Sequence, residues 1–202
     1  MTKNYIFDFG EVLVKFDTEY MTLAYLENYE DAKLVEKVVF DRLYWDRLDE
    51  GSITDDEVKQ GICSRLPDKL QKSACLVYDN WYKNVPFIKG MPEILREIKS
   101  NGGRLYLLSN ISKTFAENYH TVPEIKQVLD MFDGLVFSAE LGITKPNKEI
   151  FDYLLRRYNL KAEESVFIDD RINNIIGAQA VGIKTILFEG SVDKFKTEIR
   201  RI

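Results

Sequence analysis

The segment Tyr5-Ile6-Phe7-Asp8-Phe9-Gly10-Glu11-Val12-Leu13 decides the fold, because it joins a short apolar run to a carboxylate and then to a glycine. The apolar run has the pattern of a buried strand, with Asp8 at its end. A second segment, Val166-Phe167-Ile168-Asp169-Asp170, repeats the arrangement far along the chain. In parallel sheets, ligands bind at the carboxyl ends of the strands. If these two strands are neighbours, three carboxylates meet in one crevice and form a hard-oxygen site suited to Mg²⁺.

Five short apolar runs have the character of strands: Tyr5–Phe9, Leu105–Ser109, Leu135–Phe137, Val166–Ile168 and Thr185–Phe188. Helical segments separate the last four at spacings suited to βαβ crossovers and hence to a parallel sheet. We expect one helix over Pro92–Ser100, one opening at Lys145-Pro146-Asn147 and one over roughly Asn173–Val181. The predicted fold class is α/β, with a Rossmann-like parallel sheet flanked by helices.

The stretch from about Phe16 to Phe87 has helical periodicity and contains no convincing strand. Its length, about 70 residues, exceeds that of a single crossover connection. We therefore expect an all-helical cap inserted after the first strand, with domains at 1–15 plus 88–202 for the Rossmann-like catalytic core and 16–87 for the cap. The alternative is that these helices only cover one face of the sheet.

Composition excludes several classes of protein. The chain of 202 residues is 45% hydrophobic and 30% charged, as in an ordinary globular protein, and its net charge of −5 argues against nucleic-acid and anionic-membrane partners. No apolar run is long enough for a transmembrane segment, and no signal peptide is expected. Cys63 and Cys75 lack metal-binding spacing and fit idle thiols in a reducing cytoplasm, and the only histidine, His120, excludes a multi-histidine metal site. The oligomeric state cannot be read from the sequence.

Four polar elements follow predicted strands in a particular order: Asp8, then Ser109-Asn110, then Lys145 before Pro146, then Asp169-Asp170. Each has an ordinary alternative by itself, such as a helix cap for the acidic pair or a solvated lysine. In combination they resemble the haloacid dehalogenase-like (HAD) hydrolase superfamily, whose members are mostly Mg²⁺-dependent phosphatases with an aspartate nucleophile. The segments Phe7–Leu13, Leu108–Asn110 and Leu141–Pro146 are similar to the branch of bacterial sugar-phosphate phosphatases and the amino-terminal phosphatase domain of soluble epoxide hydrolase.

The resemblance implies a role for each element. Asp8 would be both the nucleophile and a metal ligand, which suits a carboxylate that is ionised at neutral pH and needs no base. Asp169 and Asp170 would be the other metal ligands. Lys145 would hold the phosphate and the carboxylates, and Ser109 and Asn110 would bind phosphoryl oxygens through the hydroxyl and the backbone amides. Without the metal, the three carboxylates would raise one another's pKa values.

Gly10 stands where family phosphatases usually carry a second aspartate that acts as general acid and then as base. Its backbone carbonyl can still bind the metal, so the missing function is proton transfer, typically worth about 10²–10⁴ in rate. Glu11 is a candidate substitute, although neighbouring strand residues point to opposite faces. A cap side chain, a bound water or a leaving group that departs unprotonated are the alternatives. Asn174 stands where an aspartate often reaches the metal through water, and asparagine can still bind that water.

In families of this type the cap chooses the substrate, often through a turn that reaches the active site, and Glu50–Thr54 is our candidate for that turn. Four cap aromatic residues could line the pocket, although aromatic residues on helices more often belong to the core: Tyr44, Trp45, Trp81 and Tyr82.

The sequence thus predicts a Mg²⁺-dependent phosphatase that hydrolyses a small phosphorylated metabolite, a sugar phosphate being one candidate, through a phospho-aspartate on Asp8. A 2-haloacid dehalogenase would also use an aspartate, but the Asp169-Asp170 pair would repel its carboxylate substrate. A phosphonate hydrolase would need a reactive cap lysine, and Lys59, Lys69 and Lys72 cannot be ranked. A degenerate phosphate-binding module stays open because of Gly10.

Overall fold

The computed structural model describes residues 3–201, and its centre is one parallel sheet of five strands in the order β3-β2-β1-β4-β5. The strands are β1 (Asn4–Phe7), β2 (Arg104–Ser109), β3 (Gly134–Phe137), β4 (Ser165–Asp169) and β5 (Lys184–Leu187). Strand β1 lies in the middle and pairs with both β2 and β4. The α/β fold class is confirmed, and each predicted strand is found to within two residues at either end.

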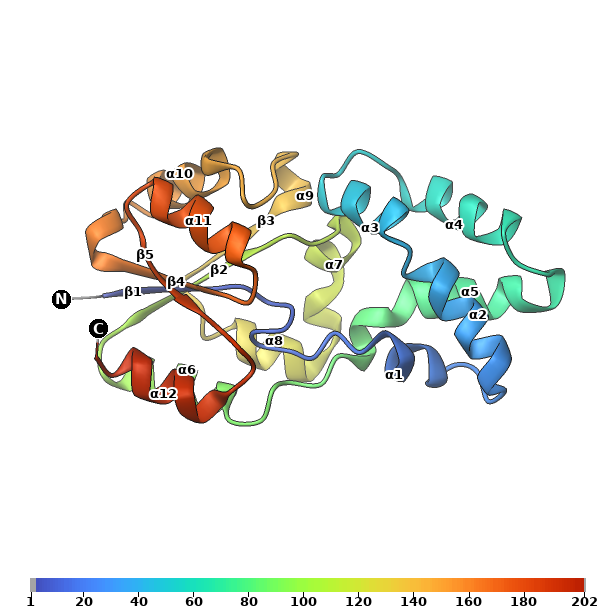
Figure 1. Cartoon of the computed structure of the whole chain (residues 1–202), viewed down its shortest axis with the longest axis horizontal. Helices are drawn as coiled ribbons and strands as arrows, with labels where there is room; N and C mark the ends of the chain where they lie inside the picture. The colour runs from blue at the N-terminus through green and yellow to red at the C-terminus, as the bar shows by residue number, and fades with distance from the viewer. Residues whose placement is uncertain (1–2, 202) are drawn as a thin grey trace.

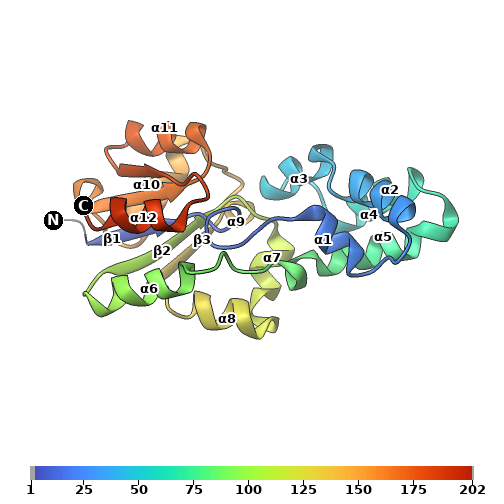
Figure 2. The same cartoon turned by 60° about the horizontal axis from the view of Figure 1, so that its bottom comes forward.

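Helices cover both faces of the sheet (Figures 1 and 2). One face carries α6 (Met91–Ser100), α8 (Pro123–Leu129) and α12 (Val192–Ile199), and the other carries α10 (Lys148–Arg157) and α11 (Ile172–Ala180). Alternate strand residues belong to two hydrophobic clusters: Phe7 and Ile168 to one, Ile6 and Phe167 to the other. Because both faces are buried, these strands read as continuous apolar runs rather than alternating ones.

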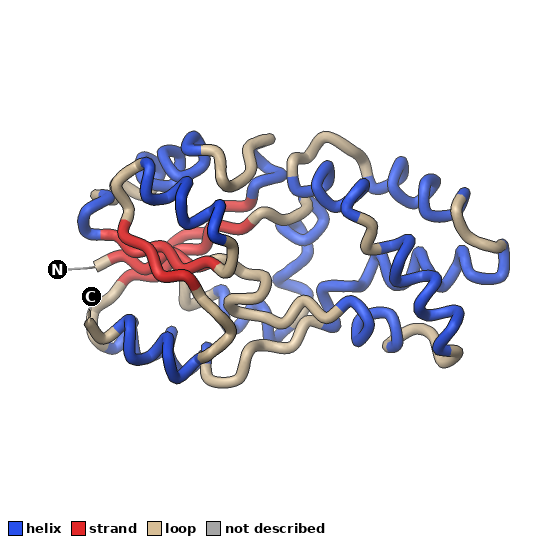
Figure 3. The backbone as a smooth tube through the Cα atoms, in the orientation of Figure 1, coloured by secondary structure: helices blue, strands red, loops and turns tan. Residues whose placement is uncertain are grey.

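A helical lobe follows β1 and lies beyond the carboxyl ends of the strands (Figure 1). It contains α1 (Thr18–Leu23), α2 (Tyr29–Val39), α3 (Arg42–Asp49), α4 (Asp55–Ser64), α5 (Asp68–Asn80) and the 3-10 helix η1 (Trp81–Asn84). Figure 3 shows the lobe as helices and loops beside the sheet, not over one of its faces. This is the inserted helical cap that the sequence predicts. The domain limits at 15/16 and 87/88 stay a prediction.

Shorter elements complete the core: α7 (Lys113–Asn118), α9 (Ser138–Leu141) and the 3-10 turns η2 (Tyr119–Thr121) and η3 (Ala162–Glu164). One expectation from the sequence needs adjustment. The helix expected to open at Lys145 begins instead at Lys148, because the main chain of Lys145 bonds to a side chain after β2. The two cysteines, Cys63 and Cys75, are free thiols and lie with their sulfur atoms 3.8 Å apart. Within the described residues, no helix combines the length and apolar character needed to cross a bilayer.

Candidate active site

The two acidic segments meet because β1 and β4 are adjacent and in register, with Phe7 opposite Ile168. The Asp8 amide continues this pairing by donating to the Ile168 carbonyl at 2.9 Å. One carboxylate oxygen from each of Asp8, Asp169 and Asp170 lies within 4.8 Å of the other two. Asp8 and Asp169 are buried and Asp170 is partly exposed. The structure therefore brings together the three carboxylates that the sequence places at strand ends.

Lys145 lies between two of these carboxylates. Its Nζ lies 2.9 Å from Asp8 Oδ1 and 2.8 Å from Asp169 Oδ2, and its side chain has no exposed surface. The face of the Phe167 ring lies 5.3 Å from the same ammonium group. Burial acts to lower the pKa of Lys145, but the charges of Asp8 and Asp169 outweigh it, and the net pKa is raised. Lys145 is therefore a fixed cation between the two carboxylates.

Asn110 explains how Lys145 reaches this place from outside the sheet. Its side-chain amide donates to the Lys145 carbonyl at 2.9 Å and accepts from the Lys145 amide at 2.8 Å. Ser109, the last residue of β2, is buried and lines the same chamber as Asp8. The Asn110 side chain is thus committed to positioning Lys145. Phosphate binding by Ser109 and Asn110 remains a prediction.

Asp169 is held by several donors. The Asn174 side-chain amide donates to both of its carboxylate oxygens at 3.0 Å, and the Arg171 backbone amide donates to Oδ1 at 2.8 Å. Asn174 lies in the first turn of α11, as expected, but it contacts Asp169 directly. Its expected contact with a metal through water stays a prediction. The direct contact shows that Asn174 orients the Asp169 carboxylate.

The electrostatics of the cluster favour a bound cation. Burial raises the pKa of Asp8 to about 7, Lys145 acts in the opposite direction, and Asp169 adds to the rise. Burial, and then Asp169, also raises the pKa of Asp170. The expected mutual effect of the carboxylates is present, although burial is the larger cause. Three converging carboxylates together with the Gly10 backbone carbonyl match the oxygen donors that Mg²⁺ prefers.

Gly10 leaves open space near Asp8, since a Cβ at this position would meet no atom within 4 Å. Its neighbour Glu11 has a left-handed backbone with φ of 54°, and its Oε1 accepts the Phe16 amide at 2.7 Å. Through this hydrogen bond, Glu11 stabilises the loop that leads into the cap. An acid/base role for Glu11 stays a prediction, and the bond to Phe16 does not favour it.

A chamber of about 350 Å³ lies between the sheet edge and the cap. On the core side it is lined by Asp8, Gly10, Glu11, Ser109, Asn110, Lys145, Asp170, Arg171 and Asn174, among others. Four aromatic residues line the cap side: Phe16, Phe40, Trp45 and Trp81. The Trp45 and Trp81 rings also pack on each other, with centroids 5.2 Å apart. Tyr44 and Tyr82 do not line this chamber and belong to the hydrophobic core.

Charged residues of the cap also line the chamber, and sequence reasoning missed them. Arg42, Asp46 and Asp49 lie on α3 at spacings of four and three residues, which place them on one face of the helix. This spacing was the sequence signal that could have identified the three charged residues. A charged helix face, however, is ordinarily a solvated one, so the pattern alone does not indicate an active site.

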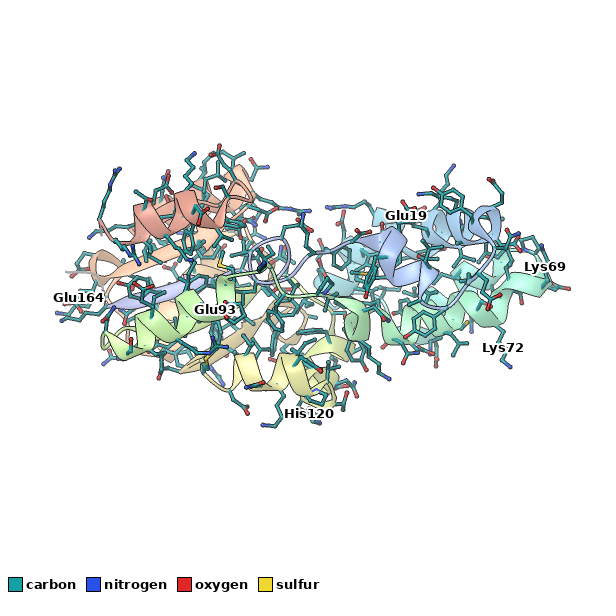
Figure 4. The ribbon with its side chains drawn as sticks, turned by 90° about the horizontal axis from the view of Figure 1, so that it is seen from below. Glu19, Lys69, Lys72, Glu93, His120 and Glu164 are labelled. Atoms are coloured by element: carbon teal, nitrogen blue, oxygen red, sulfur yellow. The ribbon has the colours of Figure 1, made fainter. Side chains whose placement is uncertain are left out.

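The cap lysines considered for phosphonate hydrolysis lie elsewhere. Figure 4 shows Lys69 at the outer end of the cap and Lys72 on its lower edge, both remote from the sheet. Lys59 pairs with Asp79 at 2.6 Å. Of the described residues, Lys145 is the lysine that lines the chamber. The geometry therefore gives no support to a mechanism that requires a cap lysine.

These features define an α/β protein with aspartates clustered at the carboxyl edge of a parallel sheet. The sequence model of the haloacid dehalogenase-like hydrolases matches residues 2–182, and the chain belongs to this family.

Similar proteins of known activity include two phosphatases. The chain is 29% identical to the sesquiterpene phosphatase astK of Aspergillus oryzae, over 88% of this chain and 85% of the relative. It is also 29% identical to the D-ribitol-5-phosphate phosphatase of Bacteroides thetaiotaomicron, over 96% of this chain and 95% of the relative. Among solved structures, a HAD family enzyme of B. thetaiotaomicron in complex with magnesium and inorganic phosphate superposes with a TM-score of 0.69 at 21% identity, covering 95% of this chain and 96% of that one.

Proposed function

We propose that this protein is a Mg²⁺-dependent phosphatase that hydrolyses a small phosphorylated metabolite, with Asp8 as the nucleophile. The observation that carries the proposal is the placement of Asp8 in a cluster of three carboxylates, two of which contact the buried ammonium group of Lys145. The two phosphatases named above support the reaction class, and the magnesium and phosphate in the related structure support the cofactor.

Asp8, Asp169, Asp170 and the Gly10 carbonyl are the residues that would hold Mg²⁺. When bound there, Mg²⁺ offsets the repulsion between the Asp8 carboxylate and a phosphate dianion. Lys145 supplies a second positive charge on the same side of the cluster. The excess of carboxylates also disfavours a carboxylate substrate, so a 2-haloacid is a weaker alternative.

The protein groups around Asp8 set the direction of attack. Asp8 Oδ1 accepts the Phe9 amide at 2.7 Å and contacts Lys145 Nζ at 2.9 Å. We therefore assign Oδ2 as the attacking oxygen. It forms a bond to phosphorus while the bond from phosphorus to the leaving oxygen breaks. Water then attacks the phospho-aspartate, releases inorganic phosphate and restores Asp8.

Ser109 and the Asn110 backbone amide are our candidates for binding the phosphoryl oxygens. The next amide along the chain, that of Ile111, donates to Ser138 Oγ at 3.0 Å and is already committed. Of the two backbone amides that follow Ser109, that of Asn110 therefore remains our candidate donor to the phosphate.

The cap side of the chamber would receive the leaving group. Phe16, Phe40, Trp45 and Trp81 give it an apolar aromatic wall, while α3 contributes charges at its rim. An aromatic ring can stack on the CH face of a sugar or contact an apolar chain. Sugar phosphates and phosphorylated apolar alcohols are therefore the two substrate classes to compare. We propose that the cap (16–87) selects between them.

A panel of phosphorylated metabolites containing both classes tests the function. We expect turnover that requires Mg²⁺, is abolished by chelation and is lost in Asp8→Asn. The matched control Asp193→Asn changes an exposed aspartate on α12 and should retain full activity. Turnover that persists without Mg²⁺, or in Asp8→Asn, contradicts the proposal. Inclusion of 2-chloropropionate in the panel tests the dehalogenase alternative.

A further inference from the structure

Asp49 is the last residue of α3 and lines the same chamber as Asp8 and Gly10. It is partly buried, yet within residues 3–201 its carboxylate has no hydrogen-bond or ion-pair partner. Two other acidic residues that line the chamber are engaged: Glu11 accepts the Phe16 amide, and Asp46 pairs with Arg42 at 2.7 Å. Asp49 is therefore a cap carboxylate that is available to a substrate.

The backbone at Asp49 is fastened to the catalytic core. Its carbonyl accepts a hydrogen bond from Ser138 Oγ at 2.6 Å, and Ser138 Oγ in turn accepts a hydrogen bond from the Ile111 amide at 3.0 Å. Ile111 is two residues beyond Ser109. One buried hydroxyl thus ties Asp49 to the loop that follows β2, and this linkage fixes Asp49 relative to the sheet edge.

The turn after Asp49 is packed just as closely. Gly51 has a φ of +66°, and a Cβ at this position would lie 2.6 Å from the Ala139 carbonyl oxygen on α9. Only glycine combines this backbone conformation with so close an approach. The turn predicted to carry specificity, Glu50–Thr54, is therefore docked on the core, and the residue before it faces the chamber.

The electrostatics of Asp49 suit proton transfer at neutral pH. Burial raises the pKa of Asp49 to about 7, and the charges of Asp46 and Asp8 add to the rise. Arg171 and Arg42 act in the opposite direction. Glu11, Lys145 and Asp170 are the further charged groups of the chamber. A catalytic acid or base is most effective when its pKa lies near the working pH.

We propose that Asp49 is the general acid and then the general base of the reaction, in the role left vacant by Gly10. This inference rests on the proposed phosphatase function. The space beside Gly10 is open, and Asp49 lines the same chamber as Asp8. In the first step, the bond from phosphorus to the leaving oxygen breaks as Asp8 attacks, and the Asp49 proton passes to that oxygen. In the second step, the Asp49 carboxylate takes a proton from the attacking water. The water oxygen bonds to phosphorus as the bond from phosphorus to Asp8 breaks.

Aryl phosphates with leaving groups of graded basicity test this role, from 4-nitrophenyl to 4-methoxyphenyl phosphate. With Asp49 present, kcat/KM should depend weakly on the leaving group. In Asp49→Asn we expect kcat/KM to fall about 10²–10⁴-fold for the most basic leaving group, and less than about tenfold for 4-nitrophenyl phosphate. The kcat for 4-nitrophenyl phosphate should fall as phosphorylated enzyme accumulates, because the second step lacks its base. Retained kcat/KM for that substrate shows that the variant is folded.

Three further variants separate the outcomes. Asp46→Asn, on the same helix and in the same chamber, should keep the shallow dependence whatever its effect on the absolute rate. Parallel losses for every leaving group in Asp49→Asn, or a steep dependence in Glu11→Gln instead, overturn the role of Asp49. If those outcomes overturn the role of Asp49 while Asp8→Asn loses all turnover, the proposed phosphatase function still holds. Activity of Asp8→Asn overturns that function itself.

Discussion

Replacement of Lys145 by methionine is the perturbation that most directly probes the electrostatics of the cluster. The substitution keeps an unbranched side chain of similar shape and removes the ammonium group that lies 2.9 Å from Asp8 and 2.8 Å from Asp169. The Lys145 and Asp169 side chains have no exposed surface, and that of Asp8 is 12% exposed. The two carboxylates that remain have little access to water to compensate for the lost charge.

The expected cost follows from this burial. Removal of one partner from a buried ion pair typically destabilises a protein by about 3–5 kcal/mol, because an uncompensated charge is left inside. For a chain of about 200 residues, each 1 kcal/mol shifts Tm by about 2–4 °C. We therefore expect Lys145→Met to lower Tm by about 6–20 °C at neutral pH in the presence of a chelator.

Urea and thermal unfolding measure this effect, with Lys148→Met as the control. Lys148 is exposed on the following helix, so its substitution should change stability by less than about 0.5 kcal/mol. Added Mg²⁺ should stabilise Lys145→Met more than the unmodified protein, because the variant site has one more uncompensated negative charge. A Lys145→Met protein as stable as the control, or an equal response to Mg²⁺, would refute this account of the cluster.

Two other predictions concern Asp49 and Gly10. The folded-state pKa of Asp49 is about 7, above its ordinary value of 3.8. The protonated form of Asp49 therefore stabilises the folded protein at low pH, and this stabilisation is lost as the pH rises through 7. Asp49→Asn should therefore be more stable than the unmodified protein at pH 8, by on the order of 1 kcal/mol, and equal to it near pH 4, as thermal unfolding can check. Gly10→Asp in the Asp49→Asn background should restore at least about tenfold in kcat/KM for 4-methoxyphenyl phosphate, because open space surrounds that position. No recovery in a folded double variant would indicate that position 10 cannot deliver a proton.

Much of the fold was predictable because each strand is a short apolar run, and β1, β2 and β4 end at or just before a polar residue of the site. The same pattern located Asp8, Asp169 and Asp170, since the carboxyl ends of parallel strands share one edge of the sheet. These inferences need only local sequence and the geometry of parallel pairing.

The remaining features depend on contacts between distant segments. The Asn110 side chain holds the backbone of a residue 35 positions away, and no local pattern distinguishes it from a turn asparagine. Asp49 resembles any acidic residue at the end of an exposed helix until Ser138, 89 positions away, fastens it to the core. Glu11 shows the opposite case. Its proximity in sequence to Asp8 suggested an acid/base role, but in the structure its carboxylate accepts a hydrogen bond from the Phe16 amide.

The measurement that tests the central claim most directly is rapid acid quenching during turnover of 4-nitrophenyl phosphate with Mg²⁺, followed by mass spectrometry of the protein and its peptides. We predict a transient phosphoryl group on Asp8, formed at least as fast as steady-state turnover and absent from Asp8→Asn. Phosphate release at full rate with the phosphoryl group on another residue, or undiminished turnover in Asp8→Asn, would contradict the claim that Asp8 is the nucleophile.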